Sequence, residues 1–81
     1  MLQQQVKVIL LKQRSEYLIG RVTELDEEPS ILIENCFEVK DDQTLIPFPS
    51  FSEQRDMFLT SDVVMSILDP SPSLVELYNT K

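Results

Sequence analysis

The side chains that most often carry catalysis or bind metals are scarce in this sequence of 81 residues. It contains no histidine, one cysteine, Cys36, and one glycine, Gly20. Without histidine there is no Ser-His or Cys-His pair, one cysteine cannot supply a thiolate zinc cluster, and one glycine cannot build a phosphate-cradling loop. We therefore expect no enzymatic activity, no cofactor and no metal.

Carboxylates are the remaining groups that could do chemistry. They gather in residues 24–28 (Glu-Leu-Asp-Glu-Glu) and at Asp41 and Asp42. Such clusters can bind a divalent ion weakly or act as a carboxylate dyad, but neither has the spacing of a calcium-binding loop, and solvated turn charges are commoner. Cys36 has no basic neighbour in sequence, which favours a half-buried structural thiol over a reactive one.

The charge is strongly negative and unevenly distributed. The net charge is −7, yet residues 1–21 carry four cations and one acid. A basic surface for RNA would have to be local, formed by Lys7, Lys12, Arg14 and Arg21, because a net acidic body repels phosphates at long range. The acids form either a solubilising face, which the composition favours, or a docking face for a basic partner protein.

Length and hydropathy restrict the class of protein. A chain of 81 residues forms one domain with a thin core, which self-association would strengthen. There is no run of 18 apolar residues, and the first five residues lack the charged start and apolar centre of a signal peptide. We expect a soluble, cytoplasmic protein.

Apolar runs separated by polar turns predict a series of short strands. The first covers residues 6–11 and is apolar on both faces, as in a strand covered on both sides. Residues 12–15 lack the residue types of a tight hairpin, so a looser connection is expected. The second strand covers residues 17–25. Gly20 within it indicates a sharp bend or a close backbone approach.

The middle of the chain predicts one further strand and a long connection. After an acidic turn, residues 30–39 are apolar at odd positions except Asn35, which predicts a strand with one wet face. The polar residues 40–44 predict a turn. The prolines in 45–51 exclude a central strand but allow an edge strand or a covering segment. Phe48 and Phe51 either cap one end of the core, which is favoured, or form a partner-binding loop.

The last third predicts two strands and a short helix. Residues 57–60 and 63–68 are apolar, and neither run contains a charge that would protect an exposed edge. Ser71 as N-cap and Pro72 at the first helical position predict a short helix with Leu74, Leu77 and Tyr78 on one side. Five strands with tight connections are typical of an all-β barrel or sandwich.

Two segments resemble the paired motifs of the Sm family. Gly20, Val22 and Asp26, followed by Pro-Ser-Ile-Leu-Ile-Glu-Asn-Cys-Phe-Glu-Val over residues 29–39, match the first motif. Residues 57–67, Met-Phe-Leu-Thr-Ser-Asp-Val-Val-Met-Ser-Ile, resemble the second, in which an apolar triplet, Arg-Gly, an Asp or Asn and Val-Val-x-Ile form two strands across a turn. The acidic, glycine-poor sequence is most similar to Sm-like proteins of cyanophage or marine viral type.

The resemblance implies a single Sm-like domain over residues 1–81. The first motif region is 6–39, the variable loop 40–55, the second motif 56–68, and the C-terminal tail or short helix 69–81. The implied fold is a small, strongly bent, five-stranded antiparallel barrel of the SH3-like kind, assembled into a homo-oligomeric ring.

Ring assembly also follows from the unprotected edges. Pairing of strand 57–60 with strand 63–68 of the next copy is a head-to-tail contact that can close into a ring. A monomer whose edge is covered by loop 45–51 is the alternative. The predicted interface residues are Met57, Phe58, Leu59, Thr60, Val63, Val64, Met65 and Ile67.

The positions that hold RNA in the Sm family are largely substituted. The resemblance places them at Asp26, Ser30, Thr60 and Ser61, of which Asp26 alone matches and is equally explained as a turn cap. Ser30 replaces asparagine, Thr60 arginine and Ser61 glycine, and threonine cannot stack on bases as arginine does. Glutamates at 27 and 28 stand where a stacking residue is expected.

We therefore expect a ring-forming, RNA-associated scaffold whose uridine-binding pocket is weakened or lost. The alternative is a protein-binding adaptor or inhibitor, of viral type, that engages a basic surface through its acidic face and binds no RNA.

Overall fold

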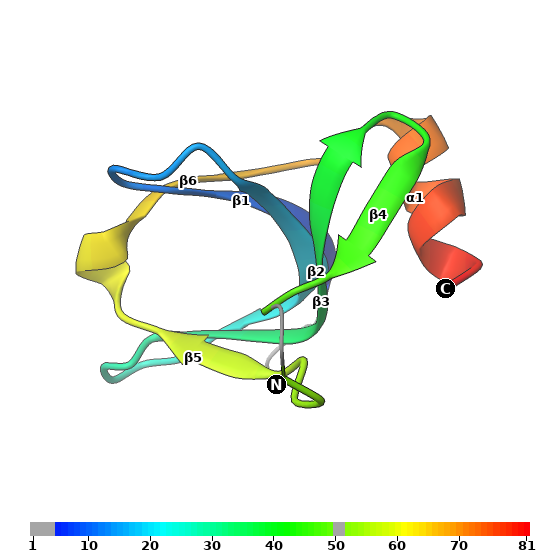
Figure 1. Ribbon diagram of the computed structural model, residues 1–81. Helices are drawn as coiled ribbons and strands as arrows, with labels where there is room; N and C mark the ends of the chain where they lie inside the picture. Colours follow the sequence, from blue (N-terminus) through cyan, green and yellow to red (C-terminus); the bar gives the residue numbers. More distant parts are fainter. Residues whose placement is uncertain (1–4, 50–51) are drawn as a thin grey trace.

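The computed structural model describes residues 5–49 and 52–81 (Figure 1). Within these ranges the chain forms one antiparallel sheet of six strands in the order β4-β3-β2-β1-β6, with β5 also paired to β3. The elements are β1 (Gln5–Leu11), β2 (Tyr17–Glu24), β3 (Ile31–Asp41), β4 (Thr44–Pro47), β5 (Met57–Leu59), the 3₁₀ helix η1 (Ser61–Val63), β6 (Val64–Leu68) and α1 (Pro72–Asn79).

The predicted all-β class and the short C-terminal helix are confirmed, whereas the predicted count of five strands is wrong. The sixth strand is β4, which pairs with β3 from Thr44 opposite Asp41 to Pro47 opposite Phe37. The proline is tolerated because β4 lies at an edge of the sheet. Of the two phenylalanines considered for the following loop, Phe48 packs against the inner core, and position 51 lies outside the described residues.

A bulge opposite Gly20 bends β2 and β3. Ile19 pairs with Phe37 and Arg21 pairs with Glu34, so the single residue Gly20 faces two residues of β3. An extra residue on one strand interrupts the ladder and bends it. Figure 1 shows β3 turning here, away from the layer that it shares with β5 and toward its hairpin with β4. The predicted bend at the lone glycine is confirmed.

The backbone at the bulge requires the residue types found there. A Cβ atom on Gly20 would lie 2.6 Å from Cγ1 of Ile33 and 2.9 Å from the carbonyl oxygen of Glu34, closer than real Cβ atoms come. Asn35 has a φ of 52°, in the left-handed region that asparagine tolerates better than most residues. Its N–H donates to the carboxylate of Asp56 at 2.9 Å, which ties the bulge to the segment before β5.

Apolar side chains on both faces of the sheet form two clusters. The inner cluster is built from β1, β2 and β3 with side chains of β5 and β6 packed against it, and the outer cluster is built from β1, β2, β4 and α1. β1 contributes to both, as its two apolar faces predicted. The buried members are Ile9, Leu11, Leu18, Val22, Ile31, Ile33 and Cys36 in the inner cluster, and Val8, Ile19, Leu45 and Tyr78 in the outer one.

β3 does not keep the single wet face that was predicted for it. Ile31 and Ile33 belong to the inner cluster, but Phe37 and Val39 pack in the outer one. The extra residue at the bulge shifts the alternation by one position, so the odd-numbered side chains change face there. Cys36 takes the inner position and is fully buried.

α1 begins as the sequence predicted. The Ser71 hydroxyl accepts a hydrogen bond from the N–H of Leu74 at 3.4 Å, and Pro72 occupies the first helical position. Leu74 and Leu77 are partly buried against the outer cluster. A helix of this length is marginal alone, so this docking stabilises it.

Tyr78 at the end of α1 contacts the bulge directly. Its side chain is 3% exposed, and its ring meets that of Phe37 edge-on, with centroids 5.9 Å apart. The hydroxyl lies 2.8 Å from the carbonyl oxygen of Asn35 and 3.2 Å from that of Glu34, and it donates to them. The helix therefore binds to two backbone carbonyl groups of β3 at the bulge.

Substitution of Gly20 by alanine tests the bend. The added Cβ has to displace the buried Ile33 or the β3 backbone, so we expect a loss of about 1–3 kcal/mol in the free energy of unfolding, measured in urea. Arg21→Ala, one position along on an exposed site, should change it by less than about 0.5 kcal/mol. Equal unfolding midpoints for Gly20→Ala and the wild type would contradict the close approach.

Candidate functional site

The sheet is not closed, and two of its edge strands are consecutive in the chain. Within the described residues, β5 pairs only with β3 and β6 pairs only with β1. η1 joins the two strands (Figure 1). Each strand keeps one edge whose N–H and C=O groups lack ladder partners, and such an edge favours pairing with another strand.

Large apolar side chains are exposed on these same strands. Phe58 on β5 is 60% exposed and Met65 on β6 is 61% exposed. Val63, just before β6, and Leu68, its last residue, are exposed as well. In the part of the chain that the structure describes, the one other exposed large apolar side chain is Tyr17. Four of the five exposed large apolar side chains among the described residues therefore lie on or beside the strands with free backbone edges, as at a protein contact.

Half of the predicted interface residues turn inward. Along residues 57–60 the inward and exposed positions alternate, as they do in a regular strand. In β6 a register shift against β1 between Val64 and Ser66 interrupts the alternation, so that Val64 and Ile67 both turn inward. Leu68, which is also exposed, lies in the predicted strand 63–68 but was not among the predicted interface residues. Met57, Leu59, Val64 and Ile67 are partly buried against the inner cluster, while Phe58, Thr60, Val63 and Met65 are exposed.

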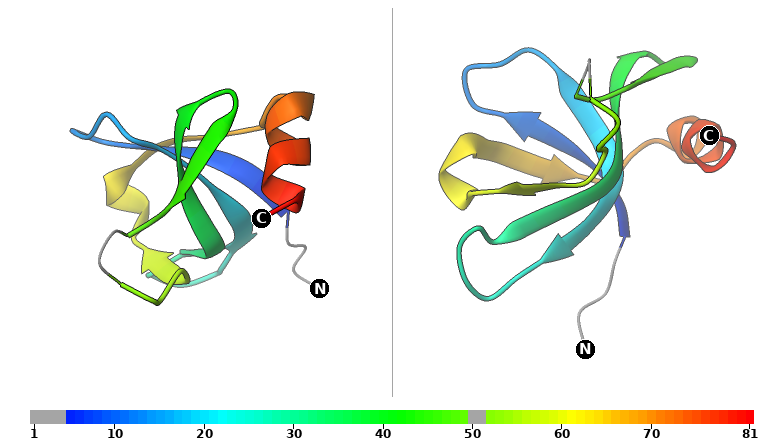
Figure 2. Two further views of the ribbon diagram at one scale, coloured as in Figure 1. Left: turned by 45° about the vertical axis from the view of Figure 1, so that its right-hand side comes forward. Right: turned by 60° about the horizontal axis from the view of Figure 1, so that its bottom comes forward.

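Three loops gather at one end of the sheet: residues 12–16, 25–30 and 60–63 (Figure 2). We call this end the loop rim. The N–H of Lys12 donates to the carbonyl oxygen of Val63 at 2.9 Å, which links the first loop to the third. The first loop is the looser connection predicted between the first two strands, and Gln13 in it has a φ of 62°.

A carboxylate joins the second loop to the third. The Glu28 oxygens accept hydrogen bonds from the backbone N–H of Ser61, at 3.0 and 3.2 Å, and from its hydroxyl at 2.8 Å. Hydrogen bonding by the Ser30 side chain and by Ser61 lowers the pKa of Glu28 below its ordinary value of 4.5. Glu28 is therefore ionised at neutral pH and holds the two loops together as an anion.

All four positions that the resemblance assigned to RNA lie on the loop rim. Asp26 is exposed, Ser30 is half-buried, and Thr60 and Ser61 are exposed where the third loop begins. The structure brings the two loops together through Glu28, which was predicted only as a loop charge. Contact between residues 33 positions apart leaves no local sequence pattern that could have predicted it.

Of the four predicted basic residues, Lys12 and Arg14 lie on the loop rim. Lys7 lies within β1 and Arg21 within β2. Arg14 donates two hydrogen bonds to Glu16, at 2.9 and 2.7 Å, and holds the pKa of that carboxyl at about 2. Lys7 forms an ion pair with Asp69. Two of the four positive charges are thus matched by acids of the same chain.

Cys36 lies in the inner cluster, where burial raises the pKa of its thiol to about 12. It is therefore a neutral, inert side chain at physiological pH. Among residues 5–49 and 52–81, no group of three or more acidic or cysteine side chains is arranged to hold a metal ion.

Replacement of Glu28 by glutamine tests the contact between the loops. A carboxyl whose folded pKa is lowered stabilises the fold above its unfolded pKa, and this stability is lost as the pH falls through the folded value. Glu28→Gln should therefore unfold more easily than the wild type at pH 7, and the difference should shrink below pH 4.5. Urea midpoints across this range measure it. The neighbouring exposed Glu27→Gln serves as control, and an equal effect there would contradict the contact.

No helix in the described part of the chain has the length and apolar character of a membrane span, since α1 has 8 residues.

Comparisons with known proteins bear on the family to which the chain belongs. A comparison with curated proteins found no significant match. A family model described as a family of unknown function (DUF6561) matches residues 4–81. The match covers nearly the whole chain, which therefore belongs to the family of unknown function DUF6561.

Proposed function

We propose that this chain is the subunit of a Sm-like homo-oligomeric ring that serves as an assembly scaffold. The observation that supports this most is the pair of free edges on β5 and β6, each with an exposed apolar side chain. Pairing of β6 in one copy with β5 in the next is a head-to-tail contact, and such contacts close into a ring when the rotation permits. The order of the two Sm-like motifs supports the same arrangement.

Side-chain burial supplies much of the driving force in this proposal. β5 and β6 have 3 and 5 residues, so a ladder between them contains few hydrogen bonds. Phe58 and Met65 are already partly covered, so each contributes about 1–2 kcal/mol when a neighbouring copy buries the rest of its side chain. This gain matters in a small domain, whose own core is thin.

The hydrogen bonds and charges of the loop rim favour a scaffold that does not select uridine over other bases. Glu28 already accepts the hydrogen bonds that Ser61 can donate through its N–H and hydroxyl. A base or phosphate approaching this point has to displace a bound carboxylate. Exposed Asp26 and Glu27 add negative charge beside it, and a ring repeats these charges around its rim, where they repel phosphate.

A second candidate function is a protein-binding adaptor or inhibitor that engages a basic partner. The pairing of the chain's own cations favours it: Lys7, Arg14 and Lys40 each form an ion pair with an acid of the same chain. Their charge is locally matched, and the net charge of −7 leaves many acids free to attract a basic surface.

Charge placed on the free edges tests the assembly. We expect the wild-type chain to form an oligomer in size exclusion coupled to light scattering. Met65→Lys and Phe58→Lys should give monomers at the same concentration, because a lysine at the contact opposes strand pairing. Tyr17→Lys changes a similarly exposed side chain away from both edges, and it should leave the oligomer intact. A monomeric wild-type chain at high micromolar concentration would refute the ring.

Titration with short RNAs tests the rim. We expect the wild-type chain to bind U-rich RNA no better than A-rich RNA, and any binding to disappear as salt is raised, because such contacts are electrostatic. Fluorescence anisotropy at two salt concentrations measures this. Tight, uridine-selective binding at physiological salt would show that Glu28 does not close the site.

A further inference from the structure

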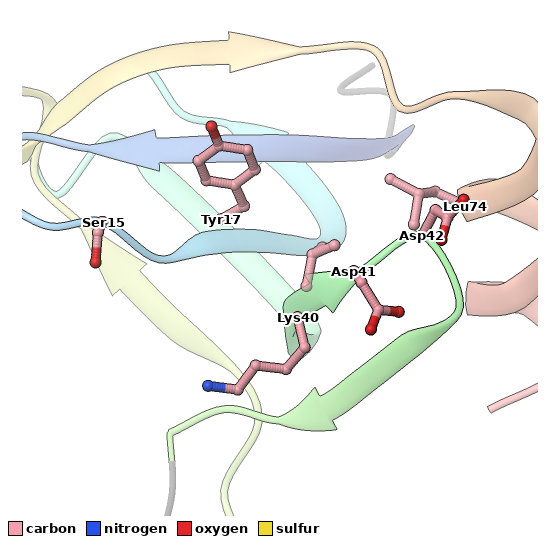
Figure 3. A pocket seen from close by; sticks show the side chains of 7 residues that line it. Ser15, Tyr17, Lys40, Asp41, Asp42 and Leu74 are labelled. Atoms are coloured by element: carbon pink, nitrogen blue, oxygen red, sulfur yellow. The ribbon is translucent and has the colours of Figure 1, made fainter.

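A groove of about 450 Å³ opens between the β3–β4 hairpin, the start of β2 and the first turn of α1 (Figure 3). It lies away from β5 and β6, and no residue of either strand lines it. Tyr17, Val39 and Leu74 supply its apolar lining, and Asp41 and Asp42 supply its carboxylates.

The apolar part of the groove is a surface without a cover. Tyr17 and Val39 are cross-strand neighbours in the β2–β3 ladder, so their side chains lie next to each other. Val39 and Leu74 are half-buried in the outer cluster, whereas Tyr17 remains 54% exposed. An aromatic ring beside two aliphatic side chains can hold the methylene stem of a long side chain.

The unmatched charge of the groove is negative. The Lys40 ammonium lies 3.3 Å from the Glu38 carboxylate, and Figure 3 shows its side chain directed away from Asp41 and Asp42. One oxygen of Asp41 accepts the N–H of Gln43 at 2.8 Å, which fixes the carboxylate in the turn and leaves its other oxygen available. Asp42, next to it, is exposed.

We infer that this groove binds an arginine or lysine side chain within an extended segment of a partner protein. The methylene stem lies on Tyr17, Val39 and Leu74, and the cation reaches Asp41 and Asp42 through charge-assisted hydrogen bonds. Arginine is preferred, because its planar guanidinium presents several N–H donors to carboxylate oxygens in a fixed geometry. The volume lies within the usual range of about 300–1,000 Å³ for ligand pockets.

The charge of the whole chain selects the class of partner. A net charge of −7 attracts a basic peptide and repels the phosphates of a nucleic acid. This inference rests on the second candidate function, the acidic adaptor, and it is independent of ring assembly.

Peptide titration followed by NMR tests the groove. The probes are a short alternating arginine-alanine peptide and the same peptide with citrulline, which keeps the shape of arginine but removes its charge. The arginine peptide should shift the amide signals of Tyr17, Val39 and Leu74, and the citrulline peptide should not. Shifts confined to another surface, or equal binding of the citrulline peptide, would overturn the inference.

Matched charge variants separate the groove from general acidity. Asp41→Asn with Asp42→Asn removes two charges while an amide oxygen remains to accept from Gln43, and it should weaken the arginine peptide about tenfold or more. Glu27→Gln with Glu53→Gln removes two exposed charges elsewhere, and it should weaken binding less than about twofold. Equal weakening by both pairs would refute the groove. The Met65→Lys variant should bind the peptide like the wild type, so failure of the ring and failure of the groove are distinguishable.

Discussion

The bulge opposite Gly20 is the constraint on which the rest of the structure depends. At this point the β2 backbone passes so close to β3 that no Cβ atom fits, and Asn35 adopts a left-handed conformation across from it. The ladder opens, and the hydroxyl of Tyr78 occupies the opening by donating to the carbonyl groups of β3. The bend and the docking of α1 thus stabilise each other.

The bend also explains why the sheet leaves free edges. On one side of the bulge β3 pairs with β5, and on the other side it pairs with β4, so the two halves of the strand face different neighbours. β6 pairs with β1 at the far side of the sheet, and the described residues show no ladder between it and β5. A monomer of this shape exposes both strands, and a second copy is the simplest partner that offers complementary edges.

Local sequence features predicted the elements well where local chemistry determines them. Gly20 predicted the bend, because no other residue type fits such a close approach, and the Ser71–Pro72 pair predicted the start of α1, because capping depends on adjacent residues. The change of face in β3 could not be predicted, since a bulge is a property of two paired strands. The alternation pattern of β3 alone therefore placed Phe37 and Val39 on the wrong face of the sheet.

The candidate sites depend even more on long-range contacts. The bonds between Glu28 and Ser61, and the meeting of Tyr17, Asp42 and Leu74 around one groove, join segments far apart in the chain. Turn residues in the sequence predicted connections near residues 26–29 and 61–62, but no pattern predicted the hydrogen bonds between Glu28 and Ser61. It also counted inward-facing residues such as Met57 as part of the interface, because alternation within a three-residue strand is too short to recognise.

In the proposed ring, copies of this bent sheet pair through β5 and β6. Amide hydrogen exchange measured at low and high protein concentration tests it most directly, because protection reports the pairing of individual strands. We expect protection of residues 57–59 and 64–68 to rise with concentration while β2 and the bulge remain unchanged. Exchange in both strands that does not depend on concentration would contradict the claim.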